Sequence, residues 1–105
     1  MRDLGVIEGN LVDVKSDRIY PARITVSEGR VVSIEETDGE YEEFILPGLI
    51  DSHIHIESTM LVPSRFAEIA VPRGTTAVVA DPHEIANIMG TKGIGYMIED
   101  ALGVP

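Results

Sequence analysis

The sequence predicts an α/β fold, with a small antiparallel β unit in residues 1–47 and two strand–helix units in residues 48–105. Three observations support this division. Short alternating strand patterns fill the first part, strand and helix patterns alternate in the second, and a Pro47-Gly48 break separates them. A chain of 105 residues also falls short of the roughly 200 residues that a complete (β/α)₈ barrel needs.

Short runs rich in β-branched residues alternate with turn signals before the break. The predicted strands are Leu4–Ile7, Leu11–Val14, Arg23–Val26, Arg30–Ile34 and Tyr41–Leu46, with a turn at Gly9-Asn10. Glu28-Gly29 separates two of these strands and predicts a tight hairpin, because glycine accepts a positive φ at no steric cost. The acidic stretch Glu35–Glu43 is interpreted as a solvated turn region.

After the break, the pattern changes to strand, loop and helix, repeated once. The predicted elements are a strand at Leu49–Ile56, a helix at Pro63–Val71, a strand at Thr75–Ala80, a helix at Glu84–Met89, and a last helix that Thr91 caps and that extends to Ala101. The apolar run Thr75–Ala80 is typical of a strand buried on both sides of a sheet. The βαβα order predicts that the two strands are parallel.

Composition and charge exclude several functional classes. The net charge of −10 opposes binding to nucleic acid and to anionic membrane surfaces, and the chain offers no cluster of basic residues. The absence of cysteine excludes disulfides and thiolate metal sites. It also makes a reducing cytoplasm the simplest expectation. The N-terminus lacks the apolar run of a signal peptide, and no apolar run has membrane-spanning length.

The first chemically informative segment is the predicted strand that follows the break. Alternation along a strand would place Asp51, His53, His55 and Glu57 on one face and isoleucines on the other. Two imidazoles two positions apart can converge on one cation, and Asp51 could orient one of them. Histidines in this spacing are often ordinary surface residues, but their place at the end of a predicted parallel strand favours a metal site.

The second segment is Asp81-Pro82-His83-Glu84, after the other parallel strand. Asp81, Pro82 and Glu84 also fit an ordinary helix start, with Asp81 as the N-cap. An ordinary helix start does not account for His83. This residue should lie at the same edge of the sheet as His53 and His55. Both a capping role and a catalytic role therefore remain open.

Together these segments resemble a known enzyme family. Residues 46–55, Leu-Pro-Gly-Leu-Ile-Asp-Ser-His-Ile-His, are similar to the first barrel strand of the amidohydrolase superfamily. The continuation through Glu57-Ser58-Thr59-Met60-Leu61, Gly74-Thr75-Thr76 and Asp81–Asn87 is similar to the adenine deaminase family within it. The resemblance implies that residues 1–47 are part of a composite β-sandwich and that residues 48–105 are the first two βα units of a TIM-type barrel.

The resemblance also implies a chemistry. A binuclear centre of manganese or iron, with zinc as an alternative, would activate water to attack C6 of adenine, yielding hypoxanthine and ammonia. His53 and His55 match metal ligands, Asp81 and His83 match a segment with a role in proton transfer or purine contact, and Glu57 and Glu84 are candidates for supporting or substrate-binding roles.

The family takes its remaining ligands from later barrel strands. We therefore expect this chain to be an N-terminal fragment that is inactive alone and that self-associates through its unpaired strand edges. Two alternatives remain: a fragment of another cyclic amidohydrolase, and a non-catalytic interaction module with no affinity for metal.

Overall fold

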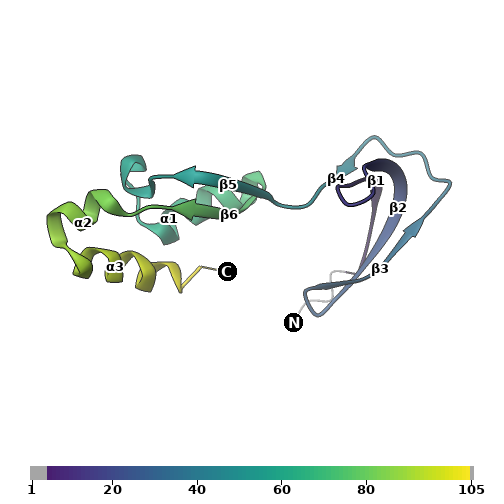
Figure 1. Ribbon diagram of the computed structural model, residues 1–105. Helices are drawn as coiled ribbons and strands as arrows, with labels where there is room; N and C mark the ends of the chain where they lie inside the picture. The colour runs from purple at the N-terminus through teal and green to yellow at the C-terminus, as the bar shows by residue number, and fades with distance from the viewer. Residues whose placement is uncertain (1–4, 105) are drawn as a thin grey trace. The chain divides into compact units, whose positions relative to one another are not determined.

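The computed structural model describes residues 5–104, a mixed α/β chain that divides into two compact units between Pro47 and Gly48 (Figure 1). Among the described residues, no helix is both long enough and apolar enough to cross a membrane.

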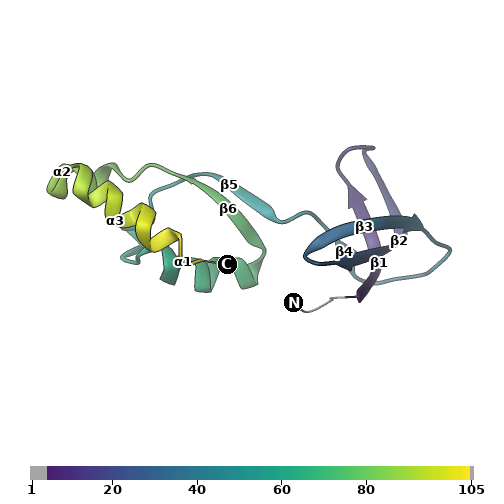
Figure 2. The ribbon, with the colours of Figure 1, turned by 90° about the horizontal axis from the view of Figure 1, so that it is seen from below.

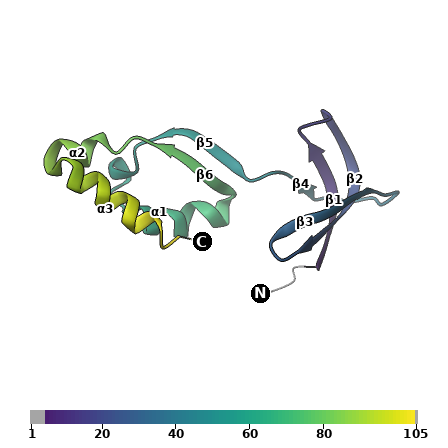
Figure 3. The same ribbon diagram turned by 60° about the horizontal axis from the view of Figure 1, so that its bottom comes forward.

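The first unit is a four-stranded sheet. Its strands are β1 (Gly5–Asp13), β2 (Arg18–Ser27), β3 (Arg30–Glu36) and β4 (Phe44–Ile45), in the order β3-β2-β1-β4. The long strands β1, β2 and β3 form an antiparallel meander, which Figure 3 shows curling over itself. Leu11, Ala22 and Ile24 form its buried cluster, and Tyr20, Val26 and Ile45 pack against them.

The hairpin predicted at Glu28-Gly29 is confirmed. Glu28 and Gly29 have φ values of 49° and 72°, and two successive positive φ values are the signature of a type I′ turn. The turn joins Ser27 to Arg30, which face each other in the β2–β3 ladder. Its backbone twist matches the right-handed twist of the flanking strands, which explains why this turn could be predicted from local sequence.

The turn predicted at Gly9-Asn10 is wrong, because both residues lie inside β1 and the chain turns at residues 14–17. Gly9 instead permits the close approach of β4, since a Cβ atom there would lie 2.9 Å from Cγ1 of Ile45. Asn10 holds the same segment: its backbone N donates to Glu43 O (2.9 Å), and its Nδ2 donates to Tyr41 O (2.7 Å). The strand β4 is also shorter than predicted and pairs with β1 in parallel, so the unit is not wholly antiparallel.

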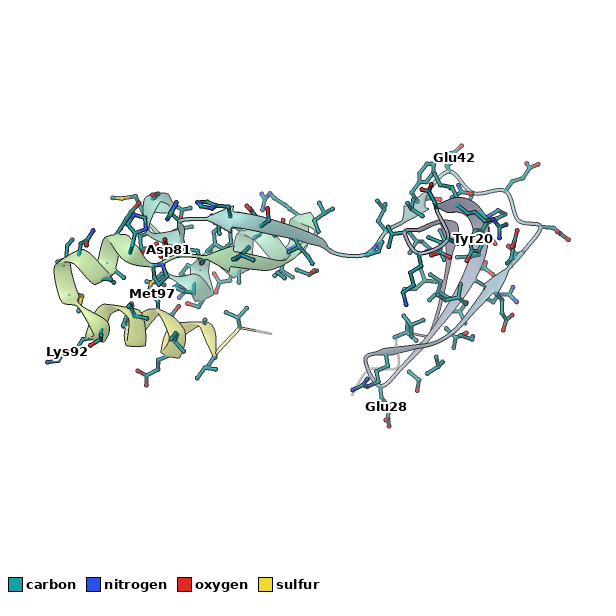
Figure 4. All side chains as sticks on the ribbon, viewed as in Figure 1. Tyr20, Glu28, Glu42, Asp81, Lys92 and Met97 are labelled. Carbon is teal, nitrogen blue, oxygen red and sulfur yellow. The ribbon has the colours of Figure 1, made fainter. Side chains whose placement is uncertain are left out.

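The second unit contains two parallel strands and several helices. Its elements are β5 (Leu49–Ile54), the 3₁₀ helix η1 (Ile56–Thr59), α1 (Pro63–Ala70), the 3₁₀ helix η2 (Val71–Arg73), β6 (Thr75–Ala80), α2 (His83–Met89) and α3 (Thr91–Ala101). The strands β5 and β6 pair in parallel, as predicted. Helices α1 and α3 lie on the same side of this strand pair (Figure 2). Val78 faces them across an apolar groove that Ile56, Pro63 and Met97 also line, and Figure 4 shows Met97 between α3 and the strands.

The prediction that Thr75–Ala80 is buried on both faces is wrong. Val79, which alternates with Val78 along β6, is 61% exposed. The described sheet has two strands, and the helices that pack on it cover one face, so the other face is open. A continuous apolar run therefore indicates a strand here, but not its full burial.

The strand β5 is irregular and ends earlier than predicted. Asp51 pairs with Val78, and Ile54 pairs with Ala80, so Ser52 and His53 together stand opposite Val79 as a β-bulge. The strand ends at Ile54, and the chain turns into η1 after His55. Glu57 therefore lies on η1, and it does not continue the alternation of Asp51, His53 and His55 along a strand.

The helix starts also differ from the predicted caps. Pro82 occupies the N-cap position of α2 and Gly90 that of α3, and neither start is capped by a side-chain hydrogen bond. Asp81 is therefore not a capping residue, and Thr91 is the first residue of α3 instead of its cap. The carboxylate of Asp81 contacts an imidazole instead.

Candidate metal centre

Three imidazoles gather where β5 and β6 end. His53 lies on β5, His55 follows the strand directly, and His83 is the first residue of α2. The ring centroids of His53 and His55 are 4.9 Å apart, and those of His55 and His83 are 4.8 Å apart, with both pairs in edge-to-face orientation. The structure thus brings together all three histidines of the chain, which come from segments about 30 residues apart.

The donor atoms of the first two rings suit a shared cation. Nε2 of His53 and Nε2 of His55 lie 3.0 Å apart. Two imidazole nitrogens bound at about 2.1 Å and at a right angle would be separated by about 3.0 Å. In the structure this contact is a hydrogen bond between the rings, and its length is close to the separation of two nitrogens that share one divalent ion.

Asp81 fixes the ring orientation that this binding requires. Its backbone oxygen lies 3.2 Å from Nδ1 of His55, and since a carbonyl can only accept, Nδ1 is the donor. Oδ2 of Asp81 lies 3.2 Å from Nδ1 of His83. Neutral rings protonated at Nδ1 carry their lone pair at Nε2. Figure 4 shows Asp81 at the junction of β6 and α2.

Asp51 does not contact an imidazole among the described hydrogen bonds. Its Oδ1 accepts a hydrogen bond from the backbone N of His53 at 3.1 Å. This contact lies within the bulge of β5 and supports the local backbone. The ring contacts that the sequence suggested for Asp51 are made by Asp81.

Two acidic side chains tie η1 to the start of α2. Oε1 of Glu84 accepts a hydrogen bond from Oγ of Ser58 (2.6 Å), and Oε1 of Glu57 accepts one from the backbone N of Ile85 (3.3 Å). Oε2 of Glu57 is buried and has no hydrogen-bond partner among the described residues. These contacts hold the segment after His55 against the segment after His83. Ser58 was missed by the sequence analysis, because only the unpredicted 3₁₀ turn brings it to α2.

Glu84 also lies close to the imidazoles. One potential ligand atom each from His55, His83 and Glu84 lie within 4.8 Å of one another. The carboxylate and the two rings are therefore close neighbours at this edge of the sheet. Together with Asp81, they form an arrangement of nitrogen and oxygen donors at one edge of the sheet.

Comparison with known proteins agrees with this chemistry. Residues 44–105 match the model of the amidohydrolase family. An adenine deaminase of Methanosphaera stadtmanae is 56% identical over 100 residues, which cover 95% of this chain and 18% of that protein. An adenine deaminase of Methanosarcina barkeri is 55% identical over 98 residues, which cover 93% of this chain and 18% of that protein.

The chain thus spans about a fifth of the length of the curated relatives that it matches. The family match includes every residue of the histidine cluster, and the identity to the relatives extends over nearly the whole chain. On this evidence, the chain belongs to the amidohydrolase family.

Proposed function

We propose that this chain provides the first metal-binding segment of an adenine deaminase, an enzyme that hydrolyses adenine to hypoxanthine and ammonia. The observation that carries the proposal is the 3.0 Å approach of Nε2 of His53 to Nε2 of His55, with Nδ1 of His55 held by Asp81. Sequence identity of 56% to a protein named adenine deaminase supports the choice of substrate.

The proposed cofactor is a pair of divalent metal ions, manganese or iron, with zinc as the alternative. Imidazole and carboxylate donors suit all three ions. When bound, such ions lower the pKa of water and polarise the group under attack. The described residues supply the imidazoles of His53 and His55 for this purpose, and the remaining ligands of a second ion would have to come from other polypeptide segments.

The roles of the neighbouring residues follow from their contacts. Asp81 is proposed as a positioning residue, since its backbone oxygen and its carboxylate each hold an imidazole at Nδ1. Proton transfer by Asp81, the other role predicted from the sequence, would require Oδ2 to leave His83. Glu57 and Ser58 are proposed to hold η1 against α2, so that the two histidine-bearing segments remain together.

The larger architecture is part of the same proposal. We propose that β5 and β6 are the first two strands of a TIM-type barrel and that residues 1–47 belong to a β-sandwich. The parallel pairing of β5 with β6 supports the barrel, as do the helices on one face. In such barrels, catalytic groups lie at the carboxyl ends of the strands, which is where His53 and His55 are found. Self-association and a cytoplasmic location remain predictions.

A chimera tests this function directly. The chain would replace the matching segment of the Methanosphaera stadtmanae enzyme, and ammonia release from adenine would be measured after loading with Mn²⁺. We expect turnover by the chimera and a loss of at least about 10³-fold when His53 and His55 are both changed to alanine, because metal activation of water is removed. The matched control is Glu99→Gln, on the exposed side of α3.

Two results would contradict the proposal. Equal turnover by the chimera and its double-alanine variant would remove the metal role of the two histidines. Turnover of another cyclic amide or amino-purine, with none of adenine, would identify a different amidohydrolase. The isolated metal-loaded chain is expected to release no measurable ammonia from adenine.

A further inference from the structure

We infer that Met60 is a site of reversible oxidation, at which a hydroperoxide converts the thioether to the sulfoxide before the other described methionines react. The inference does not depend on the proposed function, because Met60 lies outside the histidine cluster. Three observations carry it: the exposure of the Met60 side chain, the backbone conformation that keeps it exposed, and the lower exposure of the other described methionines.

Met60 departs from two ordinary preferences of protein structure. It is 91% exposed, more than any other large apolar side chain among the described residues. It also caps the end of η1 with φ and ψ values of 63° and 19°, in the left-handed region. Helix ends in this conformation usually carry glycine or asparagine. Residues that break such local preferences are often functional or strained, so the sulfur at this position calls for a chemical explanation.

Hydrogen bonds fix the turn that presents Met60. Its backbone N donates to Glu57 O at 3.0 Å, which closes the last turn of η1. The hydroxyl of Thr59 donates to Ile56 O at 2.6 Å, within the same turn. The side chain is therefore held in solvent by an ordered turn, and its exposure does not come from a frayed chain end.

The other described methionines are less accessible. The chain has four methionines, of which Met1 lies outside the described residues. Met89 ends α2 and is 52% exposed, whereas Met97 is 7% exposed and lies between α3 and the strands (Figure 4). A peroxide in solution can react only with a sulfur that it reaches, so oxidation of Met97 requires local opening of the fold. The expected order of reaction is Met60, then Met89, then Met97.

The reaction needs one peroxide for each methionine. A lone pair on the sulfur attacks one oxygen of hydrogen peroxide, so that an S–O bond forms and the O–O bond breaks. The sulfur loses two electrons, and the other peroxide oxygen leaves as water. A sulfoxide reductase supplied with a thiol returns two electrons and releases the added oxygen as water, which makes the modification reversible.

Oxidation at Met60 would change the surface and leave the fold intact. Met60 lines an apolar pocket of about 320 Å³ between η1, α2 and α3, together with Leu61, Val62 and Ile88. The sulfoxide oxygen would add a strong hydrogen-bond acceptor to this apolar rim. Because the side chain is already in water, no polar group is buried by the change. Oxidation of Met97 would instead place a polar group inside the fold.

Peroxide treatment of the whole chain tests the inference. Samples taken over time would be digested with trypsin and analysed by mass spectrometry for the gain of one oxygen. The described methionines fall in three separate tryptic peptides, residues 31–65, 74–92 and 93–105. We expect the peptide with Met60 to be oxidised first, at least about tenfold faster than the peptide with Met97.

Two controls separate the effect of the fold from that of the local sequence. In concentrated urea the three peptides should gain oxygen at similar rates, because unfolding removes the protection of Met97. Met60→Leu should leave the peptide of residues 31–65 unoxidised over the same period.

Several results would overturn the inference. Equal rates for Met60 and Met97 in the chain without urea would refute it, as would oxidation of Met89 before Met60. If a sulfoxide reductase with a thiol did not restore the unmodified peptide, the site would not be reversible. An unfolding temperature lowered by more than about 4 °C when Met60 alone is oxidised would show that its side chain is not in solvent.

Discussion

Two glycines of α3 offer a matched test of how tightly α2 and α3 pack. A Cβ atom at Gly93 would lie 2.9 Å from the backbone oxygen of Ile85 and 3.0 Å from Cβ of Met89, both on α2. A Cβ atom at Gly95 would meet nothing within 4 Å. Gly93→Ala and Gly95→Ala therefore add the same methyl group to the same helix, one into a contact and one into solvent.

The expected magnitudes have opposite signs. Replacing glycine by alanine within a helix stabilises it by up to about 1 kcal/mol. Forcing a methyl group against a neighbouring backbone costs about 1–3 kcal/mol. Gly95→Ala should therefore stabilise the second unit, Gly93→Ala should destabilise it or leave it unchanged, and the two variants should differ by about 1–3 kcal/mol.

Thermal unfolding followed by circular dichroism at 222 nm measures this difference, because the helices lie in residues 48–105. Each kcal/mol corresponds to about 4–8 °C for a domain of this size. Equal stabilisation by both substitutions would show that the two helices do not approach as closely as described.

Two further predictions concern the first unit. Ile24→Ala should lower the free energy of unfolding by about 2–5 kcal/mol, because the Ile24 side chain is 5% exposed. Ile19→Ala, on the same strand and 62% exposed, should cost much less, and equal losses in urea unfolding would contradict the assignment of the core. The Ser16 hydroxyl, and then the Lys15 amide, hold the pKa of Asp13 below its usual value of 3.8. A lowered folded-state pKa stabilises the fold above the unfolded value and loses this contribution as the pH falls through the folded value. Asp13→Asn should therefore flatten the loss of thermal stability below about pH 4, and an unchanged acid limb would refute this role.

Local sequence patterns correctly predicted those elements that depend on only a few adjacent residues. The Glu28-Gly29 hairpin depends on positive φ, and the first helix depends on proline at Pro63 and an apolar face. Both are properties of a few adjacent residues. They were therefore readable from the sequence, as was the parallel pairing implied by the strand–helix order.

The features that were missed depend on contacts between distant residues. Gly9 is required by Ile45, more than 30 residues later, so its turn signal was misleading. Asp81 stands in a sequence that is typical of a helix N-cap, but its carboxylate contacts His83 and its backbone oxygen contacts His55. Rules based on the spacing of residues in the sequence cannot predict these contacts, because the partners come together only in the folded chain.

The histidine cluster contains one feature that was predicted correctly and one that was not. The alternation of His53 and His55 correctly predicted that the two rings meet. The same alternation wrongly extended the strand to Ile56 and placed Glu57 on the face of the histidines. It did not anticipate the 3₁₀ turn, which Thr59 supports by donating a hydrogen bond from its hydroxyl to Ile56 O (2.6 Å).

The bulge at Ser52 and His53 interrupts strand pairing, but it also sets the side of the sheet on which the His53 ring lies. Deleting Ser52 would remove this bulge and restore one-to-one pairing between Asp51 and Ile54, although the separate shift between Leu49 and Ile50 would remain. The same deletion would reverse the side of the sheet on which the His53 ring emerges. A sequence change that makes the pairing of β5 and β6 more regular in this way is therefore expected to weaken metal binding. If a Ser52-deleted chain gained thermal stability and still bound Mn²⁺ as the unchanged chain does, this expectation would be wrong.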